Sequence, residues 1–334
     1  MPVIRVVFDV PKWTWHHRAM DLATFAPPEY TVHTHKESTF LNHLKDPGFV
    51  SGVDAVFFMG WASCPIQRIR KAGCKRLVSL VTSAGPAYRA VNDGDWNTWI
   101  VTGSRNYANA HTKLPRYDAI IVVNRFLADA CRNHTTRPIY LIPSGVNTDA
   151  YSPSPSGREQ HNGFRVGWCA NINGTHTVKG YKEILEPLIA ETPEWKWCVN
   201  TRNHRRAWTR EQMVDWYRTL DAFVCTSICE GTPSPVFEAA SCGVPIVSTD
   251  VGCVRDWQLP HDLHLIAPAY QNAKQAGVSR EHLRASLSAI ANMPPAERTL
   301  LGFELRSSVC KLFDYRVISP RTMEALCQTN GSER

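Results

Sequence analysis

The chain has 334 residues, of which 43% are hydrophobic and 20% charged, a composition typical of packed globular proteins rather than disordered ones. Its apolar runs are far shorter than the roughly 20 residues of a membrane span, and its 11 scattered cysteines form no CxxC pair, which excludes a membrane protein and a disulfide scaffold. The length indicates two domains. Asp9 interrupts the apolar amino-terminal run, so we expect no secretory leader and a cytoplasmic protein with reduced thiols.

The net charge of +7 is concentrated in the first half of the chain. Residues 1–150 contain 17 Lys and Arg against 11 Asp and Glu, whereas the remaining residues contain 20 against 19. This surplus fits either a slightly basic solvated surface or a half of the protein that meets an anionic partner. Nucleic acid, a phosphorylated lipid and a sugar nucleotide are partners of that kind.

Short apolar runs alternate with helix-like segments along the whole chain. In the first half, the pattern predicts strands over residues 3–10, 55–59, 76–81, 119–123 and 139–142, with a helix over 17–25. In the second half, it predicts strands over 164–169, 195–200, 222–226 and 245–248, and helices over 180–191, 210–219 and 235–242. Such alternation is typical of α/β domains with parallel sheets.

The clearest linker is residues 152–163 (SPSPSGREQHNG), which contain two Pro, two Gly and almost no apolar residue. It separates an amino-terminal domain, 1–151, from a carboxyl-terminal domain, 164–305. We expect two Rossmann-like α/β domains that face each other across an interdomain cleft. Ligands would bind at the carboxyl ends of the strands.

The most informative segment is residues 221–252 (DAFVCTSICEGTPSPVFEAASCGVPIVSTDVG). A buried strand leads there into the loop 230–234, which opens a helix. Glu230 lies on the loop and Glu238 about one turn inside the helix, so both carboxylates can accept hydrogen bonds from hydroxyls of one ligand. Amides at the start of the helix can receive an anion or sugar hydroxyls.

This Glu-x7-Glu signature, followed by GVPIVSTDVG, closely resembles the retaining GT-B glycosyltransferases of family four (glycosyl transferases group 1), which include sucrose and glycogen synthase-like enzymes. The resemblance continues in residues 118–153, 166–180 and 210–221. It implies the GT-B fold, with an amino-terminal acceptor domain and a carboxyl-terminal nucleotide-sugar-binding domain. It also implies that a last helix, 306–329, crosses back onto the first domain.

The resemblance assigns roles to individual residues. Lys179 would pair with the diphosphate of the donor, Glu230 would hold the sugar hydroxyls and Glu238 would accept hydrogen bonds from the ribose. Further donor contacts would come from the amides of Gly231, Thr232 and Ser234. The leaving phosphate would take the proton of the acceptor, so neither a metal ion nor another cofactor is expected.

The sequence departs from the family pattern at two positions. Family members usually carry an Arg a few residues before the Lys, and none stands there in this chain. The candidates to replace it at the diphosphate are Asn171, Asn173, His176, Arg202 and Arg205. Many members also place a His after the fourth strand of the first domain, where this chain has Thr82 and Ser83.

The loop after the first predicted strand, PKWTWHHR, is aromatic and basic. It resembles the Trp-rich loop of viral and phage glycosyltransferases, some of which act on modified DNA bases. Aromatic side chains can stack on a base or a sugar, and neighbouring cationic side chains can bind a phosphate. We therefore assign Trp13, Trp15, His17 and Arg18 to the acceptor, and His16 to catalysis as a base or a hydroxyl-orienting group. The alternative is that both Trp pack the core and the His lie at the surface.

These observations predict that a sugar is transferred with retention from a nucleoside-diphosphate sugar, with UDP favoured, to an acceptor hydroxyl. A hydroxymethylated pyrimidine in DNA is the favoured acceptor, because residues 1–150 carry the positive surplus. A lipid-linked or cell-surface glycan intermediate is the alternative acceptor. Two other classes stay open: a non-catalytic nucleic-acid-binding module on the same fold, and an epimerase that acts on the sugar nucleotide itself.

Overall fold

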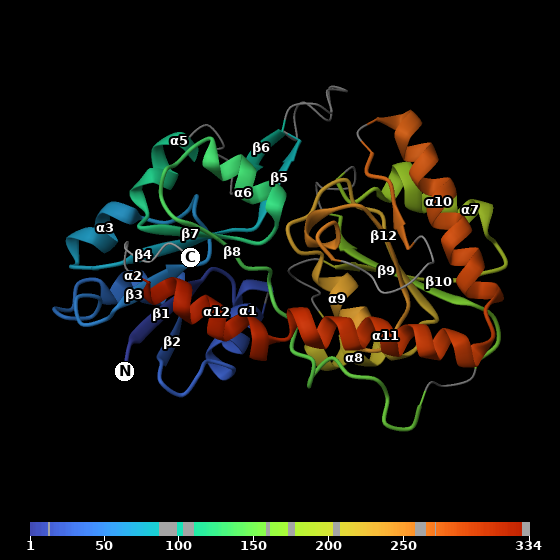
Figure 1. Ribbon diagram of the computed structural model, residues 1–334, viewed down its shortest axis with the longest axis horizontal. Coiled ribbons are helices and arrows are strands. Elements are labelled where there is room, and N and C mark those ends of the chain that lie inside the picture. Colours follow the sequence, from blue (N-terminus) through green and yellow to red (C-terminus); the bar gives the residue numbers. More distant parts are fainter. Residues whose placement is uncertain are drawn as a thin grey trace. The chain divides into compact units, whose positions relative to one another are not determined.

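The computed structural model describes residues 1–12, 14–86, 99–102, 110–157, 161–172, 178–202, 208–257, 265–270 and 272–328. The chain divides into two compact units (Figure 1). Unit 1 comprises Met1–Ala84, Ile100–Gly145 and Tyr315–Arg334, and unit 2 comprises Gly85–Trp99 and Val146–Asp314. Among the described residues, no helix is long and apolar enough to cross a membrane.

Unit 1 contains a six-stranded parallel sheet in the order β2-β1-β3-β4-β7-β8. Its strands are β1 (Val3–Phe8), β2 (Thr31–Lys36), β3 (Ala55–Phe58), β4 (Leu77–Val81), β7 (Ala119–Val122) and β8 (Ile139–Leu141). The helices of this part of the chain are α1 (Thr14–Thr24), α2 (Glu37–His43), α3 (Ile66–Lys71), α5 (Ala110–Lys113) and α6 (Arg125–Arg132). Two further strands, β5 (Ser83–Pro86) and β6 (Trp99–Thr102), pair with each other.

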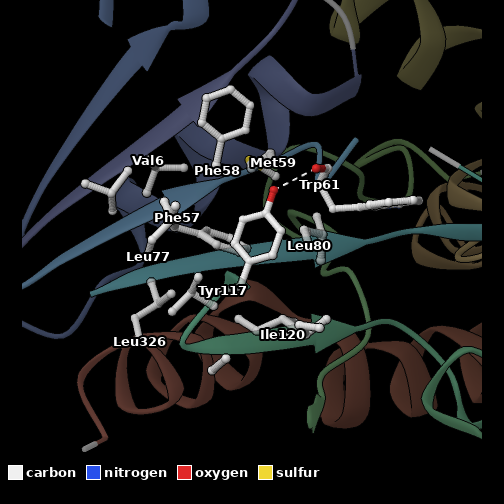
Figure 2. Packing of buried hydrophobic residues seen from close by; sticks show 14 of the residues in the cluster. Val6, Phe57, Phe58, Met59, Trp61, Leu77, Leu80, Tyr117, Ile120 and Leu326 are labelled. Carbon is white, nitrogen blue, oxygen red and sulfur yellow. Dashed lines mark hydrogen bonds between the residues drawn. The ribbon is translucent and has the colours of Figure 1, made fainter. Parts of the chain in front are cut away.

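The core of unit 1 lies around its three central strands. Every residue of β3, β4 and β7 is buried, as expected for parallel strands covered on both faces, whereas the edge strand β2 is polar and partly exposed. Figure 2 shows the phenol of Tyr117 among apolar side chains, where it donates a hydrogen bond of 2.6 Å to the Trp61 carbonyl. The one polar atom of this buried ring is therefore satisfied.

Unit 2 contains a five-stranded parallel sheet in the order β10-β9-β11-β12-β13. Its strands are β9 (Arg165–Asn171), β10 (Lys196–Arg202), β11 (Ala222–Cys225), β12 (Ile246–Thr249) and β13 (Ile266–Ala267). Its helices are α7 (Glu186–Glu191), α8 (Arg210–Arg218), α9 (Ser234–Ser241), α10 (Ala273–Asn292) and α11 (Pro295–Phe313). In Figure 1, α8, α9 and α11 lie along one side of this sheet, and α7 and α10 lie along the other.

The two parallel sheets with interleaved helices confirm the predicted α/β fold with two Rossmann-like domains. The segment before the predicted linker differs in one respect, because the structure groups Val146 and Tyr151 with the core of unit 2. The backbone carbonyl of Tyr151 accepts hydrogen bonds from Ser241 and Arg306, which explains why residues 146–151 stay with this unit. The sequence instead predicted that the amino-terminal domain extends to residue 151.

The chain returns to unit 1 through α12 (Tyr315–Cys327). The sequence predicted one helix over 306–329, but Asp314 takes an extended conformation and separates α11 from α12. The Asp314 carboxylate accepts a hydrogen bond from Thr148, and its backbone pairs with Val146, so contacts within unit 2 hold the break in place. Side chains of α12 then complete the core of unit 1.

Candidate functional site

The candidate site lies where two neighbouring strands of unit 2, β9 and β11, reach their carboxyl ends. The turn 178–180 follows β9, and the loop 226–234 follows β11. Two hydrogen bonds join them: the Ile228 amide donates to the Val178 carbonyl at 2.8 Å, and the Thr226 hydroxyl donates to the Lys179 carbonyl at 2.7 Å. The backbone of Lys179 is therefore fixed against the end of β11.

Gly180 permits this close approach. Its φ of +63° lies in the left-handed region, and a Cβ atom there would lie 2.0 Å from the Thr226 carbonyl oxygen and 2.3 Å from the Tyr270 hydroxyl. That hydroxyl donates to the same Thr226 carbonyl at 2.9 Å. A π-helical turn over Tyr181–Leu185 begins directly afterwards, whereas the sequence predicted a regular helix over 180–191.

Lys179 and Glu230 form an ion pair. The lysine Nζ donates to Oε1 of Glu230 at 2.5 Å, and the Ser227 hydroxyl donates to the same oxygen at 2.8 Å. The side chains of Lys179 and Glu230 are only 23% and 16% exposed, respectively. Burial by itself would lower the pKa of Lys179, but the adjacent Glu230 carboxylate outweighs burial and raises that pKa above its ordinary value. Lys179 is therefore a cation at neutral pH.

Glu238 projects from α9 and is held by the neighbouring helix. The Tyr217 hydroxyl, from α8, donates to Oε2 of Glu238 at 2.8 Å. Tyr217 is fully buried, and its ring contacts those of Tyr151, Trp216 and Phe223. A buried phenol needs a hydrogen-bond partner, so this contact both satisfies Tyr217 and orients the carboxylate.

The loop between the two glutamates is packed tightly against the chain after β12. The Cys253 amide donates to the Gly231 carbonyl at 3.0 Å, and a Cβ on Gly252, whose φ is +56°, would lie 2.4 Å from that oxygen. Helix α9 begins at Ser234, close to the predicted position. The Ser234 amide donates to the Thr232 carbonyl at 2.8 Å, within the loop. Its contact with a sugar hydroxyl stays a prediction.

Asn171 and Arg202 end adjacent strands. They are register partners on β9 and β10, which places both at the carboxyl edge of the sheet of unit 2. Asn171 is partly buried. The other candidates to replace the missing Arg, Asn173, His176 and Arg205, lie outside the described residues, as does the side chain of Arg202.

The residues assigned to the acceptor belong to unit 1, on or beside α1. Trp13 lies outside the described residues. Trp15 packs partly buried against the core of unit 1, with its ring about 3 Å from the position that a Cβ of Gly60 would occupy. Arg18 is 9% exposed and lines a half-open, mostly apolar pocket of unit 1 together with residues such as Phe57, Ile142 and Tyr315. Trp15 and Arg18 thus also serve the packing of unit 1.

His16 and His17 are partly buried, and their rings lie 5.5 Å apart. The Lys12 amide donates to Nδ1 of His16 at 3.1 Å, and the His16 ring lies 4.7 Å from that of Phe8. Because Nδ1 accepts a hydrogen bond, the neutral imidazole of His16 carries its proton on Nε2. That tautomer suits a group that orients a hydroxyl better than a general base.

The structure adds residues to the site that the sequence did not single out: Tyr217, Thr226, Ser227 and Tyr270. The only available signal was the helical spacing of Met213 and Tyr217, which predicts a shared buried face of α8.

Within the described part of the chain, no three His, Cys, Asp or Glu side chains are grouped so that they could hold a metal ion. Burial, with the Glu230 carboxylate adding to it, raises the pKa of the Cys229 thiol to about 12.

Comparisons with known proteins agree with this architecture. Residues 188–275, which include Glu230 and Glu238, match the family described as Glycosyl transferases group 1. Sucrose-phosphate synthase (tll1590) from Thermosynechococcus elongatus has a similar structure, with a TM-score of 0.66, 15% identity and coverage of 96% of each chain. The chain has the GT-B fold. A search of curated protein sequences gave no match.

Two further structures of similar fold contain both UDP and a sugar. Anabaena Alr3699/HepE, in complex with UDP and glucose, is similar with a TM-score of 0.66 and 12% identity, over 98% of this chain and 99% of that one. The pneumococcal O-GlcNAc transferase GtfA, in complex with UDP and GlcNAc, is similar with a TM-score of 0.58 and 16% identity, over 86% of this chain and 58% of that one. At sequence identities this low, the structural similarity establishes the fold alone.

Proposed function

We propose that this protein is a retaining glycosyltransferase that transfers a sugar from a nucleoside-diphosphate sugar, with UDP as the favoured nucleotide, to an acceptor hydroxyl. The observation that carries the proposal is the Lys179–Glu230 pair at the carboxyl edge of one Rossmann-like sheet, with Glu238 on the helix that follows the loop of Glu230. Both glutamates lie in the segment that matches the glycosyltransferase family. The UDP-containing structures of similar fold support the choice of nucleotide.

The proposed chemistry follows from the charges of these groups. Lys179 stabilises the negative charge that develops on the leaving diphosphate, as a preorganised cation in a partly buried site. Glu230 accepts hydrogen bonds from the transferred sugar. Glu238, oriented by Tyr217, accepts them from the ribose. The departing phosphate takes the proton of the acceptor hydroxyl, so the reaction uses neither a metal ion nor a cofactor.

The acceptor that we propose is anionic, because the positive surplus of the chain lies in residues 1–150. A hydroxymethylated pyrimidine in DNA is the first candidate, and a lipid-linked or cell-surface glycan intermediate is the second. His16, with its proton on Nε2, would orient the attacking hydroxyl. His17 lies beside it on α1.

The test measures thermal unfolding of the wild type and Glu238→Ala with UDP, GDP, ADP and the corresponding sugar nucleotides. A ligand at about 100 times its dissociation constant adds about 2.7 kcal/mol to the unfolding free energy, which raises the melting temperature by several degrees. We expect the melting temperature of the wild type to rise with UDP and UDP-sugars, and we expect this rise to disappear in Glu238→Ala.

A second experiment incubates the protein and a UDP-sugar with hydroxymethylated or plain DNA, which tests the acceptor. NMR of the anomeric proton of the product then tests whether the configuration is retained. Binding of DNA without binding of any nucleotide would favour the non-catalytic module.

A further inference from the structure

The structure joins two side chains that the proposed reaction uses separately. Lys179 serves the diphosphate and Glu230 serves the sugar, yet Lys179 Nζ donates to Glu230 Oε1 at 2.5 Å. We infer that this ion pair shifts the preference of the donor site away from the free nucleoside diphosphate and toward the intact sugar nucleotide. The inference rests on the proposed function. Glu230 would then determine specificity by withholding Lys179, in addition to contacting the sugar.

The backbones on both sides of the pair are held by hydrogen bonds. The Lys179 carbonyl accepts from the Thr226 hydroxyl at 2.7 Å, and Gly180 fits against the Thr226 carbonyl with no room for a side chain. On the other side, Ser227 donates to Glu230 through its hydroxyl at 2.8 Å, and its own carbonyl accepts from Thr249 at 2.6 Å. A ligand therefore separates the pair by moving side chains, while the backbone keeps both groups in the site.

The cost of separation depends on what replaces each partner. Both side chains are more than three-quarters buried, and a buried ion that loses its partner keeps an uncompensated desolvation penalty. A diphosphate can take over Lys179, but its negative charge repels the Glu230 carboxylate that it displaces. A sugar attached to that diphosphate brings hydroxyl donors to Glu230. The intact donor thus offers a new partner to both ions, whereas the free nucleoside diphosphate offers one to Lys179 alone and leaves Glu230 with the Ser227 hydroxyl but without its cation.

The ion pair also affects release of the product nucleotide. After transfer, the sugar leaves Glu230 and the nucleoside diphosphate stays on Lys179. Re-formation of the Lys179–Glu230 pair then competes with the product phosphate for the same ammonium group. The pair would therefore speed release of the product nucleotide and reduce product inhibition.

The experiment is isothermal titration of UDP, UDP-glucose and uridine into the wild type, Glu230→Gln and Glu191→Gln. Glu230→Gln keeps the shape of the side chain but removes its charge, so we expect UDP to bind about tenfold more tightly than to the wild type, equivalent to about 1.4 kcal/mol. Uridine, which has no phosphate, should bind both proteins equally. Glu191→Gln removes the same charge from a partly exposed ion pair with Arg280 and Arg284 at the end of α7, and it should change none of these affinities.

The outcomes separate the two proposals. If Glu230→Gln loses affinity for UDP-glucose while its affinity for UDP stays at the wild-type value, Glu230 is only a sugar ligand and the inference is wrong, although the transferase proposal stands. If the wild type binds neither UDP nor UDP-glucose, the UDP-dependent reaction and the inference fail together. Glu230→Ala provides the same comparison should Glu230→Gln unfold, which circular dichroism detects.

Discussion

At the scale of single residues, the two carboxylates of the candidate site share one feature. Each accepts a hydrogen bond from a hydroxyl on a neighbouring part of unit 2: Ser227 donates to Glu230, and Tyr217 donates to Glu238. A hydroxyl orients a carboxylate without neutralising it, so the group keeps its strength as an acceptor for sugar or ribose hydroxyls. Each glutamate is thus oriented by a neutral donor, and Glu230 has the Lys179 ammonium as a further, charged partner.

Tyr217→Phe tests this arrangement. The substitution removes one hydroxyl from a buried ring and leaves the shape of the core intact. Glu238 then loses the donor that orients it toward the ribose, so we expect UDP to bind about tenfold more weakly, equivalent to about 1.4 kcal/mol. KM for the sugar nucleotide should rise while kcat changes little, because the ribose lies away from the reacting bond.

The matched control for that substitution is Tyr140→Phe, which removes a hydroxyl from β8 in unit 1 and should leave UDP binding unchanged. A nucleotide with a 2′,3′-dideoxyribose adds a second readout. It should bind the wild type and Tyr217→Phe almost equally, since it has no ribose hydroxyls for Glu238. An equal loss for both nucleotides would show that Tyr217 supports only the fold.

At the scale of elements, the pairing of β1 with the edge strand β2 contains a titratable contact. Arg5 on β1 donates to Nε2 of His35 on β2 at 2.9 Å, and the half-buried imidazole packs against Phe40 and Phe49. Burial, together with the positive charges of Arg5, His33 and His43, lowers the pKa of His35 to about 4. The edge of the sheet therefore depends on a neutral histidine.

This contact predicts a pH dependence of stability. Between about pH 6.5 and pH 4, the unfolded chain binds a proton at His35 that the folded protein excludes, so the free energy of unfolding falls as the pH falls through this range. His35→Gln keeps an acceptor for Arg5 but does not titrate. Urea unfolding at pH 7 and pH 5 should show a smaller decrease for His35→Gln than for the wild type. His111→Gln, at an exposed position on α5, is the control, and an unchanged decrease in His35→Gln would contradict the prediction.

At the scale of the whole molecule, unit 1 depends on the end of the chain. Tyr315, Ile318, Met323 and Leu326 of α12 are buried with residues of β1, β3 and β4 in one core. The guanidinium of Arg76 donates to the Leu326 carbonyl at 2.7 Å and to the Ala325 carbonyl at 3.1 Å, which satisfies acceptors at the end of the helix. Residues 250 positions apart in the sequence thus stabilise the same unit.

Leu326→Ala measures this dependence. Leu326 is fully buried, and a Leu→Ala change at such a position costs about 2–5 kcal/mol of unfolding free energy. Leu300→Ala on α11 is the matched control, because Leu300 is 59% exposed and its loss should change the free energy by less than about 0.5 kcal/mol. Chemical denaturation of both variants checks the difference. Equal effects would show that α12 contributes little to the core.

The sequence by itself predicted most of the buried strands and the local placement of the two glutamates, whereas it missed the polar edge strand β2 and helices such as α6 and α10. Alternating apolar runs are local, so they predicted buried strands such as β3 and β11, and the loop-to-helix motif predicted Glu230 on a loop and Glu238 inside α9. Trp13, Asn173, His176 and Arg205 lie outside the described residues, as does the side chain of Arg202, so their predicted roles stay proposals.

Tertiary structure alone decided which groups meet. Lys179 and Glu230 are 51 residues apart, and Tyr217 and Glu238 are 21 apart, so no periodic pattern links either pair. They meet because neighbouring parallel strands end at the same edge and α8 packs beside α9. The break at Asp314 likewise depends on Thr148, a contact across 166 positions. Local sequence patterns report local conformation, whereas these contacts depend on how distant elements pack.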